Sequence, residues 1–303
     1  MRDNNFSQHL PLWAVHGLML LAAILVSSSF TVGKAITHGL DPAVLILIRF
    51  LLATTLFAPL VIGRGLFFLP PLRQLIGYGT ISACTVGFFW CMFAALRHTT
   101  AINTSIIFTL VPGISGVYSA IFLHERLGRS RLWALLFGMF GALWVIFGGD
   151  IHRLLAMDVN QGDLLFLAGC FLMAAYTPLV QRVHRQESML VMTFWVLATG
   201  CLWLLILSAP RLAAIDWHGV EPMVWVGIIY LAIFTTIVTF YLTHLATPYL
   251  GPTRVMAYSY FYPAFVLVID WAMGNRLPPP IILPGVAVVT LAIVVIQRGV
   301  GKG

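Results

Sequence analysis

Residues 12–34 read LWAVHGLMLLAAILVSSSFTVGK, with no Asp, Glu, Arg or Lys before Lys34. A run of about 20 mostly apolar residues is long enough to cross the hydrocarbon core of a bilayer as a helix. This run is longer than the apolar part of a signal peptide, and no small-residue cleavage motif follows it. We therefore expect it to remain in the protein as the first membrane-spanning helix.

The same composition extends over the whole chain of 303 residues. Hydrophobic residues make up 60% of it and charged residues only 9%, and the mean hydropathy is +0.96. Soluble domains carry about 25% charged residues, so the helices of this chain need lipid or other helices around them. The net charge of +7 forms no basic face. We expect the lipid bilayer and a small-molecule substrate as partners, and no nucleic acid.

Proline, glycine and charge clusters divide the chain into ten apolar stretches of spanning length. The predicted fold class is therefore an all-α integral membrane protein with ten transmembrane helices. The predicted spans are 12–34, 42–62, 72–96, 101–123, 132–148, 162–183, 189–207, 223–246, 252–273 and 281–296.

The basic residues between the spans predict the orientation, because lysine and arginine accumulate on the cytoplasmic side of a membrane. Ten fall on one side and five on the other, which places both termini in the cytoplasm. The ten are Arg2, Arg64, Arg73, Arg126, Arg129, Arg131, Arg182, Arg185, Arg298 and Lys302, and the five are Lys34, Arg97, Arg153, Arg211 and Arg276.

The positions of a few residues indicate an internal repeat. Sliding the chain on itself by 146 residues sets Phe30 on Tyr176, and a slide of 151 sets Pro112 on Pro263. Because each unit would hold five helices, an odd number, the second unit enters the membrane from the opposite face. Inverted repeats of this kind are typical of transporters. The two predicted five-helix repeats cover residues 12–149 and 162–297.

Pro112 and Pro263 lie near the middle of the fourth and ninth predicted spans. Each proline removes a helical N–H and displaces the carbonyl four residues earlier, which bends the helix. A matched pair of bends suits two repeats that rock against each other, so we predict a hinge at both prolines. The alternative is that proline is simply commoner in membrane helices.

Several predicted spans carry polar and aromatic side chains on one face, three or four residues apart. This spacing is typical of a helix that lines something other than lipid. For any single residue, ordinary helix packing is the alternative, but as a set the residues predict a substrate cavity walled by rings. The predicted substrate-binding residues are Ser27, Thr31, Tyr78, Ser82, Thr85, Phe89, Trp90, Asn103, Phe108, Tyr176, Tyr230, Phe234, Thr239, Arg254, Tyr258 and Tyr262.

The chemistry of these side chains constrains the ligand. Rings offer flat apolar surfaces, and hydroxyls can hold an amino or carboxylate group. A cation inside a membrane costs so much free energy that a functional role is the default hypothesis. We expect Arg254 to contact the substrate. Arg49 is equally well explained as a clamp on a neighbouring helix. The middle third of the spans holds no carboxylate or histidine. We therefore expect flux without an obligatory proton.

The sequence offers no constellation for an enzyme active site. It has no GxSxG, P-loop or GxGxxG motif, and His124-Glu125 begins like HExxH but continues without a second histidine. The four cysteines fall inside apolar stretches with no CxxC pair, the pattern of buried structural thiols. We expect no catalysis, no metal and no cofactor.

Short motifs in a fixed order resemble the drug/metabolite transporter superfamily and, within it, the ten-helix EamA family. The sharpest is Glu125-Arg126-Leu127-Gly128 after the fourth predicted span, followed by Gly138 and Gly141. The aromatic segment from Ala257 to Pro263 is most similar to YddG-type aromatic amino acid exporters. The second repeat departs from the family pattern with Asn275-Arg276-Leu277-Pro278. The remaining motifs are Ser28-Ser29-Phe30-Thr31, Leu47-Ile48-Arg49-Phe50 and the segment from Ala94 to Ala101.

The resemblance implies a secondary transporter that exports aromatic and other hydrophobic amino acids across a bacterial inner membrane. We expect alternating access, with the carrier acting as a uniporter. Export of another small metabolite or drug handled by the same superfamily is the alternative. A membrane enzyme or a scaffold would be a different class. An enzyme would need a clustered acid, base or metal site, which the sequence lacks, and a scaffold would not need bends and polar faces inside the membrane. The residues do not decide among Trp, Phe, Tyr, Thr or Met as substrate, nor the oligomeric state.

Overall fold

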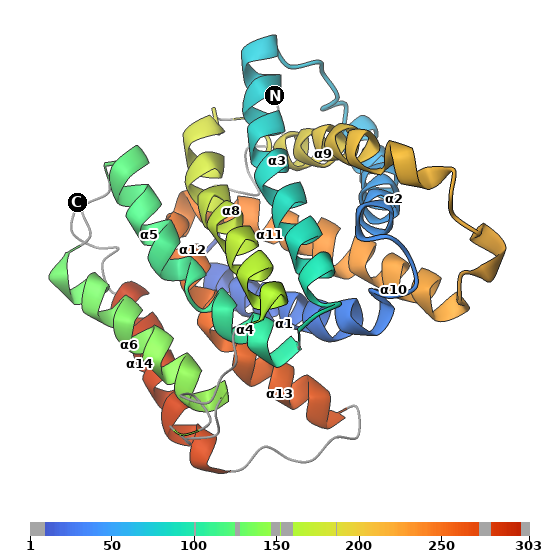
Figure 1. Cartoon of the computed structure of the whole chain (residues 1–303). Helices are drawn as coiled ribbons and strands as arrows, with labels where there is room; N and C mark the ends of the chain where they lie inside the picture. Colours follow the sequence, from blue (N-terminus) through green and yellow to red (C-terminus); the bar gives the residue numbers. More distant parts are fainter. Residues whose placement is uncertain are drawn as a thin grey trace.

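A computed structural model of the chain describes residues 10–99, 101–124, 128–146, 152, 160–185, 187–272 and 280–297, and within these ranges it contains helices and no strand (Figure 1). The predicted all-helical class is confirmed. The first half holds α1 (Leu12–Ile36), α2 (Pro42–Ile62), α3 (Leu72–Ala95), α4 (Ala101–Phe108), α5 (Val111–Phe122) and α6 (Arg129–Ile146).

The second half repeats this order with more interruptions. It holds α8 (Gln161–Val183), α9 (Met189–Leu212), the short η1 (Trp217–Gly219), α10 (Pro222–Ala232), the π-helix η2 (Ile233–Val238), α11 (Thr239–Leu250), α12 (Pro252–Ala257), the 3-10 helix η3 (Tyr258–Phe261), α13 (Tyr262–Ala272), η4 (Pro280–Ile282) and α14 (Leu283–Gln297).

Among the described residues, six helical stretches are long and apolar enough to cross a membrane. They are α1, α2, α3, α8, α9 and the continuous run from α10 to α11, and shorter apolar helices lie in α5, α6 and α14. These helices make the chain a multi-pass membrane protein. The predicted spans 42–62 and 162–183 agree with α2 and α8 to within one residue at either end.

Local sequence chemistry explains where these helices begin. Asp41 caps α2 by accepting a hydrogen bond from the backbone N–H of Ala43, and Pro42 occupies the first turn, where its missing N–H costs nothing. Asn160 and Asp163 form a reciprocal capping box at the start of α8. Ser188 caps α9 in the same way as Asp41 caps α2.

The two matched prolines lie just after helix interruptions, not inside bent helices. Pro112 is the second residue of α5, which follows a turn at Thr109 and Leu110, and Pro263 is the second residue of α13, which follows η3. In a first turn, proline loses no helical hydrogen bond. The predicted spans 101–123 and 252–273 are therefore each divided into shorter helices, and the hinge role of the prolines stays a prediction.

Helices from the two halves pack against each other throughout. The most extensive packing joins α3 with α8, α6 with α14 and α2 with α9, and in Figure 1 the first two pairs lie side by side. Gly141 shows why α6 and α14 approach so closely, because a Cβ there would stand 3.0 Å from the carbonyl oxygen of Gly285. Most buried apolar side chains form one cluster to which both halves contribute.

Candidate transport site

A group of aromatic rings from five helices lies at the centre of the fold. Phe108 on α4 is its hub, with its ring centroid 5.3 Å from Tyr262 on α13, 5.6 Å from Phe88 on α3 and 5.9 Å from Phe30 on α1. Phe166 on α8 completes the group. The sequence predicted Phe108 and Tyr262 as lining residues, and the structure brings them together.

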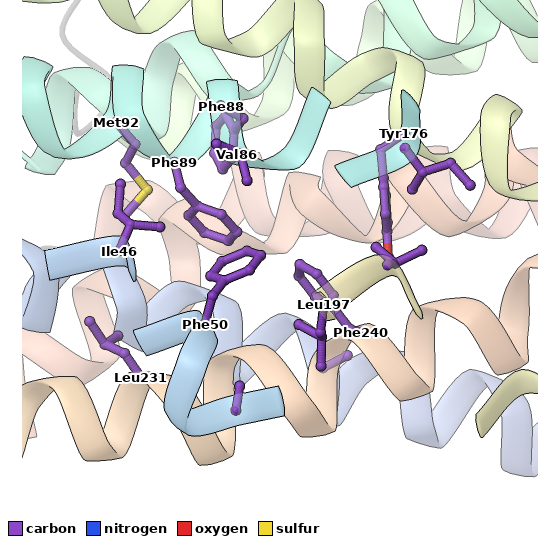
Figure 2. Close-up of a cluster of buried hydrophobic side chains, with 14 of the residues drawn as sticks. Ile46, Phe50, Val86, Phe88, Phe89, Met92, Tyr176, Leu197, Leu231 and Phe240 are labelled. Atoms are coloured by element: carbon purple, nitrogen blue, oxygen red, sulfur yellow. The ribbon is translucent and has the colours of Figure 1, made fainter. Parts of the chain in front are cut away.

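A second group of rings continues from the first through Phe88 and its neighbour Phe89 (Figure 2). Phe89 stacks on Phe240 of α11 and meets Phe50 of α2 edge-on, with centroid distances of 6.3 and 6.0 Å. Tyr176 of α8 closes the group at 5.8 Å from Phe240. We call these two groups together the ring cluster: Phe30, Phe50, Phe88, Phe89, Phe108, Phe166, Tyr176, Phe240 and Tyr262.

The predicted hydroxyl side chains are buried but bond mainly to their own helices. Ser27 donates to the carbonyl of Ala23, Thr85 donates to that of Ser82, and Thr239 donates to that of Thr235. Ser82 differs, because it also accepts a hydrogen bond of 3.0 Å from the Thr199 hydroxyl on α9. Backbone bonding of this kind satisfies a hydroxyl inside a membrane helix.

Tyr258 and Arg254 lie together near the start of α1. The Tyr258 hydroxyl forms a hydrogen bond with Nδ1 of His16, and Arg254 donates 3.3 Å to the carbonyl of Leu250. Arg254 also lines a hollow, described below. The structure thus places these two predicted residues at one end of the fold.

The remaining predicted residues differ in burial and in their contacts. Tyr230 bonds Ser28 through its hydroxyl at 2.7 Å, but its neighbour Phe234 is 44% exposed and lies on the outer surface. Thr31 and Trp90 are half-buried, and Tyr78 lies near the start of α3, where its hydroxyl donates to Glu187. The backbone of Asn103 lies in α4, and its side chain is outside the described part of the chain.

The sequence-based site omitted two buried polar residues. Arg49 on α2 is fully buried against the π-helix η2, with its guanidinium carbon 4.3 Å from the centroid of the Phe89 ring. Its position inside a span was the available signal. His244 on α11 is also fully buried, and it bonds Tyr176 and Thr193 through its two ring nitrogens at 2.8 and 2.6 Å.

The bonds of His244 define its tautomer. The Thr193 hydroxyl donates to the carbonyl of Met189, so it accepts from Nδ1–H of His244. Nε2 then accepts from the Tyr176 hydroxyl. The imidazole, hydrogen-bonded at both nitrogens, ties α8, α9 and α11 together.

Two hollows open at the same end of the fold, which we call the hollowed end. One, of about 430 Å³, lies between the loop after α2 and the start of α9, and the other, of about 330 Å³, lies around the turn between α11 and α12. Residues of both hollows flank the last turn of α8. Their lining residues include Gln74, Arg185 and Glu187 in the first and Gln181, Tyr249 and Arg254 in the second.

The carboxylate of Glu187 organises the first hollow. It accepts hydrogen bonds from the Tyr78 hydroxyl and the backbone N–H of Arg185, and it lies 3.9 Å from Nδ1 of His184. Burial lowers the pKa of His184 from its ordinary value, and the nearby carboxylate opposes this only in part. His184 therefore tends toward its neutral form.

At the opposite end, cations reach between helices, and we call it the clamped end. Lys34 at the end of α1 donates to the carbonyl of Leu96 after α3, at 2.6 Å. In exchange, Arg97 donates to the carbonyls of Thr37 and Leu40 after α1, at 3.0 and 2.7 Å. Each cation thus satisfies carbonyls at the C-terminus of the other helix, where positive charge is favourable.

A further hydrogen bond ties the start of α8 into the clamped end. The Thr99 hydroxyl donates to the carboxylate of Asp163 at 2.5 Å, and the Thr99 carbonyl accepts a hydrogen bond from Lys34. An exposed ion pair of 3.4 Å joins Arg211 to Asp41 nearby. The clamped end therefore joins α1, α3 and α8 by charged or charge-assisted contacts.

The described residues show no group of three or more His, Cys, Asp and Glu side chains that could hold a metal ion. All four cysteines are free.

One family matches both halves of the chain, at residues 13–147 and again at 160–298, and it is described as the EamA-like transporter family. The chain belongs to this family. The family resemblance predicted from the motifs is confirmed. That this EamA-like transporter belongs to the YddG-type subgroup stays a prediction.

Relatives of this EamA-like transporter include three proteins named as uncharacterized transporters. YetK of Bacillus subtilis is 24% identical over 247 residues, which are 78% of this chain and 71% of YetK. A protein of Archaeoglobus fulgidus is 24% identical over 265 residues, 87% of this chain and 90% of its own length. YdfC of B. subtilis is 24% identical over 280 residues, 89% of this chain and 85% of YdfC.

A solved crystal structure shares the fold of the EamA-like transporter. It has a TM-score of 0.70 and 18% sequence identity, and the match covers 94% of this chain and 98% of that protein. At this level of identity the likeness concerns the fold alone.

Proposed function

We propose that this EamA-like transporter exports amino acids, chiefly aromatic and other hydrophobic ones, by alternating access. The observation that carries the proposal is the ring cluster, in which side chains from α1 to α4 meet side chains from α8, α11 and α13 at the centre of the fold. Rings of this kind bind an aromatic or aliphatic side chain by edge-to-face and stacking contacts.

The arrangement of the two halves supports alternating access. Corresponding helices pair across the molecule, α2 with α9 and α6 with α14, and the family matches each half separately. We propose that the halves, residues 12–149 and 162–297, are inverted repeats that rock about the centre. Their interruptions before Pro112 and Pro263 would then be the matched hinges.

The direction of export rests on the charge distribution. Arg64, Arg73, Arg182 and Arg185 flank the hollowed end, whereas Lys34 and Arg97 belong to the clamped end. The more basic side of a membrane protein faces the cytoplasm. We propose that the hollowed end and both termini face the cytoplasm of a bacterial cell, so that substrate enters between α2, α8, α9 and α12.

We propose uniport, with flux that follows the substrate gradient. The buried histidine beside the ring cluster, His244, is hydrogen-bonded at both nitrogens, to Tyr176 and Thr193. Its hydrogen bonds suit a tie between helices better than a group that exchanges protons in each cycle.

Uptake into proteoliposomes tests the proposal. Purified protein would be offered each amino acid in turn, with and without a pH gradient. We expect saturable flux of phenylalanine, tyrosine or tryptophan that persists when the pH gradient is collapsed. Flux that stalls on collapse of the gradient would refute uniport, and flux of another metabolite or drug, with no amino acid carried, would favour the broader superfamily alternative.

A further inference from the structure

Arg49 is a positive charge enclosed by the membrane-spanning helices. It lies in the middle of α2 and is fully buried. A guanidinium does not lose its proton under ordinary conditions, and burying an unpaired charge is costly. An arginine at such a position either has a complete set of hydrogen-bond partners or has a function that accounts for the loss of stability.

The partners of Arg49 are incomplete. Nε donates to the hydroxyl of Thr236 at 2.6 Å, and Nη2 donates to the hydroxyl and carbonyl of Thr235 at 3.0 and 3.2 Å. Both threonine hydroxyls in turn donate to the carbonyl of Leu231, so they are held as acceptors. Nη1 is buried without a hydrogen-bond partner among the described residues, and none of the groups that bond Arg49 is acidic.

The backbone around these partners is unusual. Thr235 and Thr236 belong to η2, a π-helix of six residues between α10 and α11. π-helical turns are rare and occur frequently at functional sites. Here two consecutive threonine hydroxyls bond the same guanidinium, which is thereby fixed in one orientation.

The ring cluster adjoins the guanidinium. Arg49 lies over the face of Phe89. Phe89 also contacts Phe50 and Phe240, as Figure 2 shows. The fixed guanidinium has an Nη1 group without a hydrogen-bond partner in the described part of the chain, and flat apolar rings lie beside it. Such a site can bind a molecule that carries a carboxylate near a ring. Guanidinium groups bind carboxylates with two parallel hydrogen bonds through adjacent nitrogens.

We propose that Arg49 binds the carboxylate of the transported substrate through Nη1, while Phe50, Phe89 and Phe240 contact the substrate side chain. This inference rests on the proposed function and names a specificity-determining residue for it. Because Arg49 is enclosed here, the carboxylate reaches it only when helices around the ring cluster move apart during the transport cycle.

The test compares three ligands on detergent-purified, full-length protein: L-phenylalanine, L-phenylalaninamide and 3-phenylpropionate. Binding is measured by calorimetry, which does not depend on transport. We expect wild-type protein to bind both carboxylates at least about tenfold more tightly than the amide, since each lost charge-assisted contact is worth about 1.5–3 kcal/mol. Equal affinity for L-phenylalanine and its amide, or no binding of either carboxylate, would overturn the inference.

Arg49→Lys keeps the charge but loses the planar fork, and Arg49→Gln loses the charge. For both variants we expect the preference for L-phenylalanine over the amide to fall to about one. Arg64→Gln, at an exposed loop position, is the matched control for loss of one positive charge, and we expect its preference to stay at the wild-type value. A purely structural clamp would instead lower the affinities for acid and amide equally.

The outcomes separate this inference from the proposed function. If wild-type protein binds L-phenylalanine through Arg49 but moves none across proteoliposomes, the carboxylate site stands and export fails. If wild-type protein transports amino acids but binds the amide as tightly as the acid, the export proposal stands and the carboxylate site is refuted. If both Arg49 variants misfold, equal affinity of wild-type protein for the acid and the amide still overturns the inference.

Discussion

The two ends of this EamA-like transporter are held by different kinds of contact. At the clamped end, Lys34 and Arg97 each satisfy the terminal carbonyls of the other's helix, and Asp163 accepts from Thr99. At the hollowed end, the turn at Gly251, which has a positive φ of 79°, and the loop after α2 leave room for two hollows. Charged contacts thus tie helices together at one end, whereas two hollows open at the other.

The largest effect is expected from removing the clamp with Lys34→Met and Arg97→Met together. Each charge-assisted hydrogen bond contributes about 1.5–3 kcal/mol, so their loss should shift the population at least tenfold toward a state open at this end. A Ser27→Cys reporter, in a variant whose four native cysteines are replaced by alanine, would be labelled in right-side-out vesicles with a membrane-impermeant thiol reagent. We expect labelling to rise by about tenfold.

Arg211→Met is the matched control for this prediction. Arg211 belongs to the same end and pairs with Asp41, but the ion pair is exposed and therefore contributes little. We expect its labelling to stay within about twofold of the parent protein. If the double variant labels no faster than Arg211→Met, the cations do not hold this end closed.

A smaller effect is expected from Pro263→Ala, which tests how the two ends communicate. Alanine allows η3 and α13 to join into one stiffer helix. We expect transport to slow about fivefold, which corresponds to about 1 kcal/mol in the barrier, with unchanged membrane insertion. Pro59→Ala, at an exposed position in α2, is the control, and a wild-type rate for Pro263→Ala would remove the hinge.

The smallest effect concerns His184 at the hollowed end. Because burial lowers its pKa in the folded protein, the unfolded chain binds more protons as the pH falls. This contribution to stability is therefore present above about pH 6.5 and is lost as the pH falls from there toward the folded value. We expect the melting temperature to fall further from pH 7.5 to pH 5.5 in wild type than in His184→Gln. The difference between the two falls should be a few degrees at most. Equal drops in melting temperature for wild type and His184→Gln would contradict this prediction.

The sequence predicted the fold well because hydropathy and helix-start chemistry are local. The start of α2 at Pro42 and that of α9 at Met189 follow from Asp41 and Ser188, each of which caps the helix beside it. The interruptions were harder to place. A proline indicates that a regular helix stops nearby, but the turn at Thr109 and the 3-10 turn at Tyr258 also depend on packing against other helices.

The site was only partly predictable, because periodicity identifies a face and not what the face meets. Phe108 and Tyr262 are in contact in the structure, whereas Phe234, on an equally periodic face, lies at the surface. Arg49 and His244 depend on partners distant in sequence, Thr236 and Tyr176. No local pattern predicts these pairings, although an arginine in a span is a signal by itself.

The most direct test of alternating access is counterflow of labelled L-phenylalanine in proteoliposomes without a pH gradient. The account predicts that unlabelled phenylalanine inside the vesicles accelerates entry of the label, because each return of the carrier is faster with substrate bound. It also predicts that the label transiently exceeds its external concentration. Entry no faster than into protein-free vesicles, with or without internal substrate, would contradict the account.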